Sequence, residues 1–180
     1  IEGTFDNSAT LTELRFLAKA FNSTGKKIYK TSFLKGLQCI LKNQYENGGW
    51  PQKPNSSGYS QHITFNDGTM IGIMHFIQEV AVNPSYSFVD KKTRIECNDR
   101  FNRGIKCILA CQIKADNKLT AWCAQHDKNN YKPVGARSYE HPSISGGESA
   151  GIVSLLMSLK KPSKEVKKSI IEAVEWYEKS

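Results

Sequence analysis

Apolar residues recur at helical spacing along most of this chain. Between Thr10 and Phe21 they return every three or four positions, with Asp6, Ser8 or Thr10 as candidate caps, which predicts a first helix ending near Gly25. The same spacing, together with capping residues, glycines and prolines, predicts five further helices over residues 26–43, 66–82, 90–112, 147–159 and 163–177. No strand longer than a few residues is indicated, and residues 113–123 fit a short hairpin. The pattern therefore predicts an all-α fold.

This helical pattern repeats itself within the chain. Six residues reappear 68 positions later, because Phe33, Gly36, Cys39, Ile40, Leu41 and Gln44 match Phe101, Gly104, Cys107, Ile108, Leu109 and Gln112. In both copies a tryptophan and then a glutamine follow, and a third copy is expected to begin at residues 170–176. Helical pairs at a fixed period are typical of helical arrays and α/α toroids. We expect about two and a half hairpins of such a toroid here, in a single domain over residues 1–180.

Composition narrows the class of protein only slightly. Hydrophobic residues make up 39% and charged residues 23%, and no apolar run approaches the roughly 20 residues that span a bilayer. The net charge of +8 favours polyanionic partners. Because the basic residues are spread out and no nucleic-acid module is visible, an acidic polysaccharide is favoured over nucleic acid or a membrane.

The five cysteines form an odd number and lack the C-x-x-C spacing of zinc or redox sites. Cys107 and Cys111 lie four residues apart, on one face of a predicted helix. We therefore expect them to be buried core thiols.

Two polar loops separate the predicted helices and carry most of the candidate chemistry. One spans residues 119–148 and the other residues 48–67. Their capable side chains are Trp50, Gln52, Tyr59, His62, Asn66, Asp67, Trp122, Gln125, His126, Asp127, Arg137, Tyr139, Glu140 and Glu148. Long polar loops usually hold a site, and since each loop follows a helix, we expect them to form one cleft.

Each candidate side chain also has a plainer interpretation. Asn66, Asp67 and Asp127 are oxygen ligands of the kind that hard cations prefer, although Asn66 and Asp67 would also suit a helix cap. Arg137 suits paired hydrogen bonds to a substrate carboxylate, or else a salt bridge to Glu140 or Glu148 that stiffens the loop.

The rings and the remaining carboxylate leave similar alternatives. His62 and His126 have the chemistry of a general acid or base, but a structural hydrogen bond is the commoner role of a lone histidine. Aromatic rings in the loops suit either stacking against sugars or core packing; they belong to Trp50, Tyr59, Trp122 and Tyr139. Glu148 suits the N-terminus of a helix. Neither a nucleophile elbow nor a phosphate-binding glycine loop is present.

Several strings resemble the family 10 polysaccharide lyases, which are pectate lyases built as an α/α toroid. They are GGWPQ at 48–52, HITFND at 62–67, LTAWCAQHD at 119–127, ARSYE at 136–140 and SGGESAGIVSLLMSL at 145–159. The order is kept from about Leu34 to Trp176. The resemblance implies an α/α toroid that is incomplete at the C-terminus, with long loops and at most a short β-hairpin.

The same resemblance implies a secreted, monomeric pectate lyase that cleaves polygalacturonate by calcium-assisted β-elimination. Asp67 and Arg137 would be catalytic, Arg137 by holding a galacturonate carboxylate, while Asn66, Asp67 and Asp127 would bind Ca²⁺. The implied substrate-binding residues are Trp50, His62, Asn66, Trp122, His126, Tyr139 and Glu140. The family uses an arginine as the base, which is not assigned to a residue of this chain. The alternative is a non-catalytic module that binds acidic polysaccharide.

Overall fold

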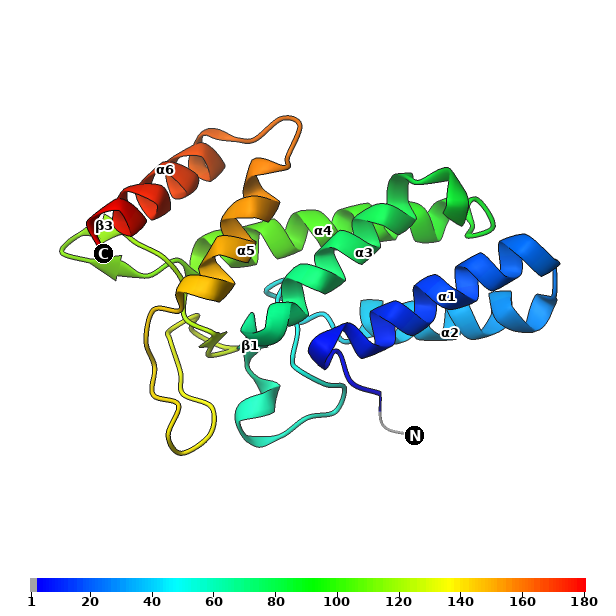
Figure 1. Cartoon of the computed structure of the whole chain (residues 1–180), viewed down its shortest axis with the longest axis horizontal. Coiled ribbons are helices and arrows are strands. Elements are labelled where there is room, and N and C mark those ends of the chain that lie inside the picture. The colour runs from blue at the N-terminus through cyan, green and yellow to red at the C-terminus, as the bar shows by residue number, and fades with distance from the viewer. Residues whose placement is uncertain (1–2) are drawn as a thin grey trace.

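The computed structural model describes residues 3–180, which form three helical hairpins (Figure 1). The first pairs α1 (Ala9–Thr24) with α2 (Lys27–Lys42), and the second pairs α3 (Thr69–Val82) with α4 (Lys91–Cys111). In the third, α5 (Gly146–Met157) is followed by α6 (Lys164–Lys179). All six predicted helices are confirmed. The expected third copy at residues 170–176 lies within α6, which is the second helix of its pair, as α2 and α4 are of theirs.

Local sequence signals fix the ends of these helices. Helix α1 is capped at its C-terminus by Gly25, whose positive φ of 66° lets its N–H bond the carbonyl of Phe21. Helix α4 begins after Asp90, whose carboxylate accepts the N–H of Thr93 at 2.9 Å. Capping residues therefore set the lengths of the hairpins, and with them the positions of the loops.

The repeated glycine permits close packing within the first two hairpins. A β-carbon on Gly36 would lie 2.5 Å from a methyl of Leu14, and one on Gly104 would lie 2.9 Å from the Met74 side chain. Neither distance is possible for a real side chain, so the two copies of this glycine let α2 approach α1 and α4 approach α3.

The repeated tryptophan closes the second helix of its own hairpin. The indole N–H of Trp50 donates to the carbonyl of Ile40 at 2.9 Å, and that of Trp122 donates to Ile108 at 2.8 Å. Both carbonyls belong to the last turn of a helix, where backbone acceptors lack helical partners. Each loop is thereby fastened to the helix that precedes it.

The repeated glutamine ties each hairpin to the next. The amide nitrogen of Gln44 donates to the carbonyls of Gly48 and Arg100, both at 2.9 Å. Gln112 donates to Thr120 at 2.9 Å and to Ser169, in α6, at 3.0 Å. These buried bonds hold successive hairpins in register.

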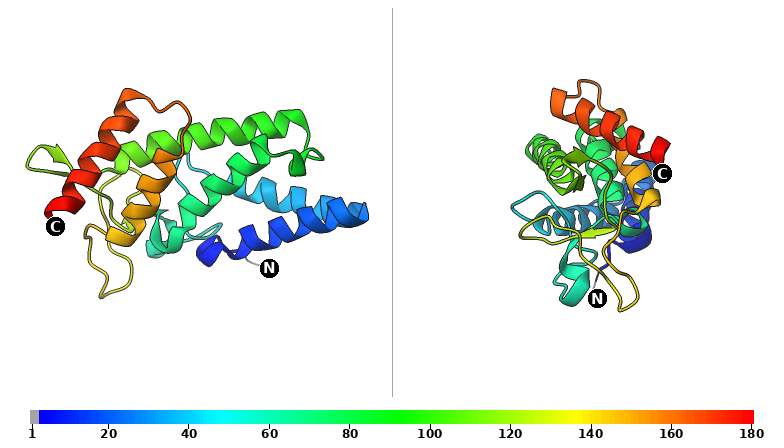
Figure 2. Two further views of the ribbon diagram at one scale, coloured as in Figure 1. Left: turned by 45° about the horizontal axis from the view of Figure 1, so that its top comes forward. Right: turned by 90° about the vertical axis from the view of Figure 1, so that its left-hand side faces the viewer.

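Four two-residue strands complete the described part of the chain. The pair β2 (Lys114–Ala115) and β3 (Lys118–Leu119) is the predicted hairpin. The pair β1 (Ile63–Thr64) and β4 (Gln125–His126) is antiparallel and joins the two polar loops, which the expectation of at most one hairpin missed. Both loops lie at the same end of the helical hairpins (Figure 2).

The thiols and the helix lengths complete the description of the fold. All five cysteines are free in the structure, and Cys107 and Cys111 are buried as expected. Across residues 3–180, no helix combines the length and the apolar character that crossing a membrane requires.

Candidate active site

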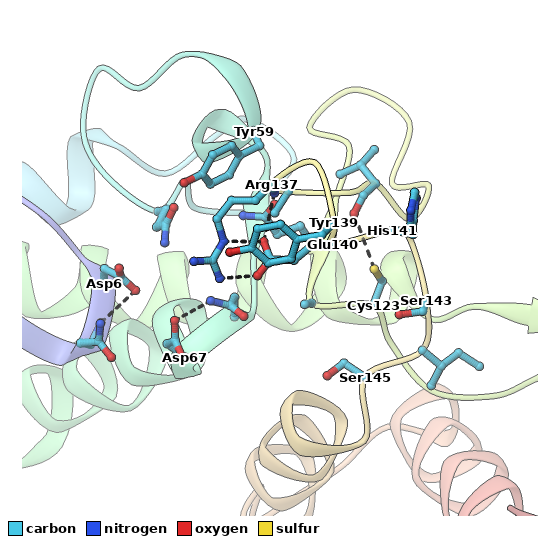
Figure 3. A pocket seen from close by; sticks show the side chains of 18 residues that line it. Asp6, Tyr59, Asp67, Cys123, Arg137, Tyr139, Glu140, His141, Ser143 and Ser145 are labelled. Atoms are coloured by element: carbon cyan, nitrogen blue, oxygen red, sulfur yellow. Dashed lines mark hydrogen bonds and ion pairs between the residues drawn. The ribbon is translucent and has the colours of Figure 1, made fainter.

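A cavity of about 680 Å³ lies where the two polar loops meet the N-terminal ends of α1, α3 and α5 (Figure 3). Asn66, Asp67, Arg137, Tyr139 and Glu140 line it, and polar groups account for most of its lining. The prediction that both loops contribute to one cleft is confirmed.

Asp67 reaches the cavity from a left-handed turn that precedes α3. Its φ is 52°, Gly68 follows with a φ of 68°, and the α-helix begins only at Thr69. No side chain caps this helix, and the amide of Asn66 donates instead to the carboxylate of Asp67. The capping interpretation of Asn66 and Asp67 is therefore wrong, and the carboxylate faces the cavity.

A second turn of the same kind, which was not predicted from the sequence, precedes α1. Residues 5–8 precede α1 as residues 65–68 precede α3, with positive φ values of 50° at Asn7 and 58° at Ser8. Asp6 and Asn7 line the cavity beside Asn66 and Asp67. The signal was present, because Phe-Asp-Asn-Ser reappears as Phe-Asn-Asp-Gly at the start of the next hairpin.

Several negatively charged groups lie near Asp67. Burial raises the pKa of its carboxyl, and the nearby charges of Asp6 and Glu148 raise it further, against the opposing effect of Arg137. A cation would relieve this repulsion, and Asp67 and Asn66 offer the oxygen atoms that a hard cation prefers. Within residues 3–180, however, no group of three or more His, Cys, Asp or Glu side chains converges as a ready metal site.

Arg137 forms the loop salt bridge that was one of its two interpretations. Its guanidinium bonds both carboxylate oxygens of Glu140, and this interaction raises the pKa of Arg137 and lowers that of Glu140 to about 2. An arginine whose pKa is raised further is a poor proton acceptor. The structure therefore suits Arg137 to binding a carboxylate and not to acting as the base.

Asp127 and His62 lie outside the cavity lining. The β1–β4 register pairs Ile63 with His126, which places Asp127 beside His62 and leaves Asp67 beyond the opposite end of the ladder. One oxygen of Asp127 accepts the N–H groups of Asn129 and Asn130, and the other lies 3.7 Å from Nδ1 of His62. The prediction that Asp127 joins Asn66 and Asp67 as one ligand set is wrong.

The aromatic residues divide between core and cavity. Trp50 and Trp122 are fully buried, so the prediction that they bind substrate is wrong. Tyr59 and Tyr139 line the cavity and are 42% and 68% exposed. These two phenol rings, and not the tryptophans, are the surfaces on which a sugar ring can stack.

His126 is a structural residue. Its Nε2 accepts the N–H of Cys123 at 3.0 Å, and its Nδ1 lies 2.7 Å from the carbonyl of Tyr131. Only the neutral ring protonated at Nδ1 satisfies both partners. His126 is fully buried, so its predicted substrate-binding role is wrong.

Buried His126 makes the stability of the fold depend on pH. Burial lowers its pKa from 6.5 to about 4, so between these values the unfolded chain binds the proton more tightly. The contribution is therefore complete above pH 6.5 and is lost as the pH falls toward 4, to a total of about 3 kcal/mol. Urea unfolding at pH 7.5 and pH 5 should show the loss in the wild type and in His75→Gln. His126→Gln should lack much of this pH dependence. An equal loss of unfolding free energy between pH 7.5 and pH 5 in all three proteins would contradict the lowered pKa of His126.

Comparison with solved structures gives a close match. The chain superposes on the family 10 polysaccharide lyase from Cellvibrio cellulosa with a TM-score of 0.92 and 34% sequence identity, over 98% of this chain and 56% of that chain. An aspartate-to-alanine mutant of that lyase in complex with trigalacturonic acid matches with the same TM-score of 0.92 and 34% identity. No curated protein sequence matches the chain. The chain thus spans 56% of the length of the lyases it resembles.

The paired helices and the polar cavity between their loops define a helical toroid of the polysaccharide lyase type. The whole sequence, residues 1–180, also matches the pectic acid lyase family. The chain belongs to this family.

Proposed function

We propose that this chain is a pectate lyase domain that cleaves polygalacturonate by calcium-assisted β-elimination and acts outside the cell as a monomer. The observation that carries the proposal is that the Asn66–Asp67 turn and Arg137 share one cavity in a member of the pectic acid lyase family. The complex of the Cellvibrio lyase with trigalacturonic acid supports the choice of substrate class.

The proposed reaction explains why charged groups gather in the cavity. Elimination removes the proton next to a uronate carboxylate and breaks the bond to the leaving sugar oxygen, so negative charge grows on that carboxylate. Arg137 would hold a galacturonate carboxylate, and Tyr59 and Tyr139 would stack against the sugar rings. Stabilising the growing charge is the main catalytic task.

Asn66 and Asp67 would hold the calcium ion of the proposed reaction. Their oxygens and the negative surroundings of Asp67 fit such an ion, and the substrate and water would complete its coordination. When bound, calcium would neutralise the uronate carboxylate and make the neighbouring proton more acidic.

One observation favours the alternative of a binding module. Arg137 is the one arginine in the cavity lining of the part of the chain that the structure describes, and its raised pKa keeps it charged. Binding of polygalacturonate therefore needs only the residues of the cavity, whereas elimination also needs a base.

Ultraviolet absorbance of the unsaturated product separates the two functions. The 180-residue chain is incubated with polygalacturonate, first with calcium and then with a chelator. Absorbance that rises with calcium and stops with chelator supports the lyase. A flat trace, from a folded chain that binds trigalacturonic acid in calorimetry, supports the binding module instead.

A further inference from the structure

Arg137 holds a carboxylate that belongs to its own loop. Its Nε donates to Oε2 of Glu140 at 3.0 Å, and its Nη2 donates to Oε1 of the same residue. The backbone N–H of Arg137 also donates to Oε2 at 3.0 Å. The carboxylate of Glu140 thus occupies one edge of the guanidinium with both oxygens, as a uronate carboxylate would.

Main-chain hydrogen bonds present Glu140 to Arg137. The N–H of Glu140 donates to the carbonyl of Arg137 at 2.8 Å, and the N–H of Ala136 donates to the carbonyl of Glu140 at 3.1 Å. Gly135 permits this closure, because a β-carbon there would lie 2.6 Å from the Glu140 carbonyl oxygen. Main-chain bonds therefore keep the turn closed when the Glu140 side chain is changed.

The pair lies where substrate is expected and is free to open. Arg137 and Glu140 both line the cavity with Asp67, and the guanidinium lies over the ring of Tyr139 at 5.2 Å (Figure 3). The Arg137 side chain is 57% exposed and that of Glu140 is 35% exposed. Exchange of one carboxylate for another therefore requires only side-chain rotation.

We propose that Glu140 is a resident carboxylate, which an ionised galacturonate displaces from Arg137 on binding. This inference rests on the proposed function, and it changes the role of Glu140 from a contact with substrate to a competitor of substrate. The Glu140 pKa of about 2 keeps the competitor charged throughout the neutral range. A methyl-esterified sugar offers no anion to the guanidinium, so it would bind and leave the pair intact.

Glu140→Gln tests the competition, with Asp6→Asn as its matched control. Both changes remove one negative charge from the lining of the same cavity, but only Glu140 bonds Arg137. Calorimetry in calcium buffer measures binding of trigalacturonic acid and of its methyl ester. Because an exposed ion pair is weak, Glu140→Gln should tighten binding of the acid only about two- to fivefold. Binding of the ester should not change, and Asp6→Asn should gain less than half as much.

A double variant locates the effect at Arg137. In an Arg137→Gln background, adding Glu140→Gln should give no gain beyond that of Asp6→Asn, because no guanidinium remains to be released. Thermal unfolding verifies that each variant is folded.

The inference is overturned if Glu140→Gln binds the acid no tighter than Asp6→Asn does, or more weakly than the wild type. The first result would mean that substrate uses the free edge of Arg137, and the second that Glu140 orients Arg137 for substrate. These outcomes are read from binding alone. If Glu140→Gln tightens binding of the acid while the wild-type chain forms no unsaturated product, the inference is upheld and the lyase activity is rejected.

Discussion

Asp67→Asn should lower the rate of unsaturated product formation roughly a hundred- to a thousandfold, the loss typical of removing one electrostatic group from an active site. The substitution keeps the shape of the side chain and removes its charge. Asparagine also tolerates the left-handed conformation of residue 67, where φ is 52°, so the turn before α3 should persist. Initial rates at saturating calcium and polygalacturonate measure the effect.

Asp116→Asn is the matched control for this experiment. Asp116 also has a positive φ of 49°, but it lies in the β2–β3 hairpin and outside the cavity lining. The same chemical change on the same backbone conformation should leave both the rate and the midpoint of thermal unfolding close to those of the wild type. If Asp67→Asn retains more than about a third of the rate, the charge of Asp67 is not part of the mechanism.

A weaker response to calcium should accompany the lower rate. When a carboxylate ligand is replaced by an amide, the site keeps an oxygen but loses the charge that attracts a hard cation. The calcium concentration for half-maximal rate should therefore rise in Asp67→Asn and remain unchanged in Asp116→Asn. This shift distinguishes a ligand of the cation from a residue that only shapes the turn.

The helices were predictable because their signals are local. Three such signals are the apolar spacing of α1, the cap at Asp90 and the cap at Gly25. Each acts within a few residues of its own position in the sequence. The repeat also predicted the paired packing, since the glycines at 36 and 104 occupy equivalent contacts. Such elements can be predicted because the residues that start, pack and end them are close together in the sequence.

The composition of the cavity was less predictable because it depends on contacts between distant segments. Asp127 and Asp67 each end a motif that contains residues capable of chemistry. The β1–β4 register nevertheless places them beyond opposite ends of the same two-stranded ladder. Likewise, Trp122 reads as a loop aromatic in the sequence, whereas the structure places it under a helix end. A sequence shows which side chains are capable of chemistry, but the tertiary register decides which of them meet.

Asp6 illustrates a signal that was visible but misinterpreted. Asp6 stands just before the apolar spacing of the first helix, which makes it a candidate cap, and the same position before α3 makes Asp67 one. The structure shows that both turns precede their helices without capping them. Comparing the starts of the hairpins, and not only their second helices, would have identified both turns as lining one cavity.

Trp122→Ala should lower the free energy of unfolding by about 3–5 kcal/mol, the usual loss for a buried aromatic ring. Trp122 is fully buried in the core, with 0% of its surface accessible to water. Its indole N–H bonds the last turn of α4, and its carbonyl accepts the N–H of Ser145 at the start of α5. The change therefore leaves a cavity in the core and an unpaired carbonyl at Ile108.

Trp122→Phe separates these two contributions. It keeps most of the ring volume but cannot donate to Ile108, so it should cost about 1–3 kcal/mol, the usual penalty for a buried acceptor left unpaired. Trp176→Ala is the control for loss of an indole, because Trp176 is only partly buried in α6 and should cost less. Urea unfolding at pH 7.5 measures all three variants. Equal losses for Trp122→Ala and Trp176→Ala would contradict the role of the Trp122 indole in closing α4 and fastening the following loop to it.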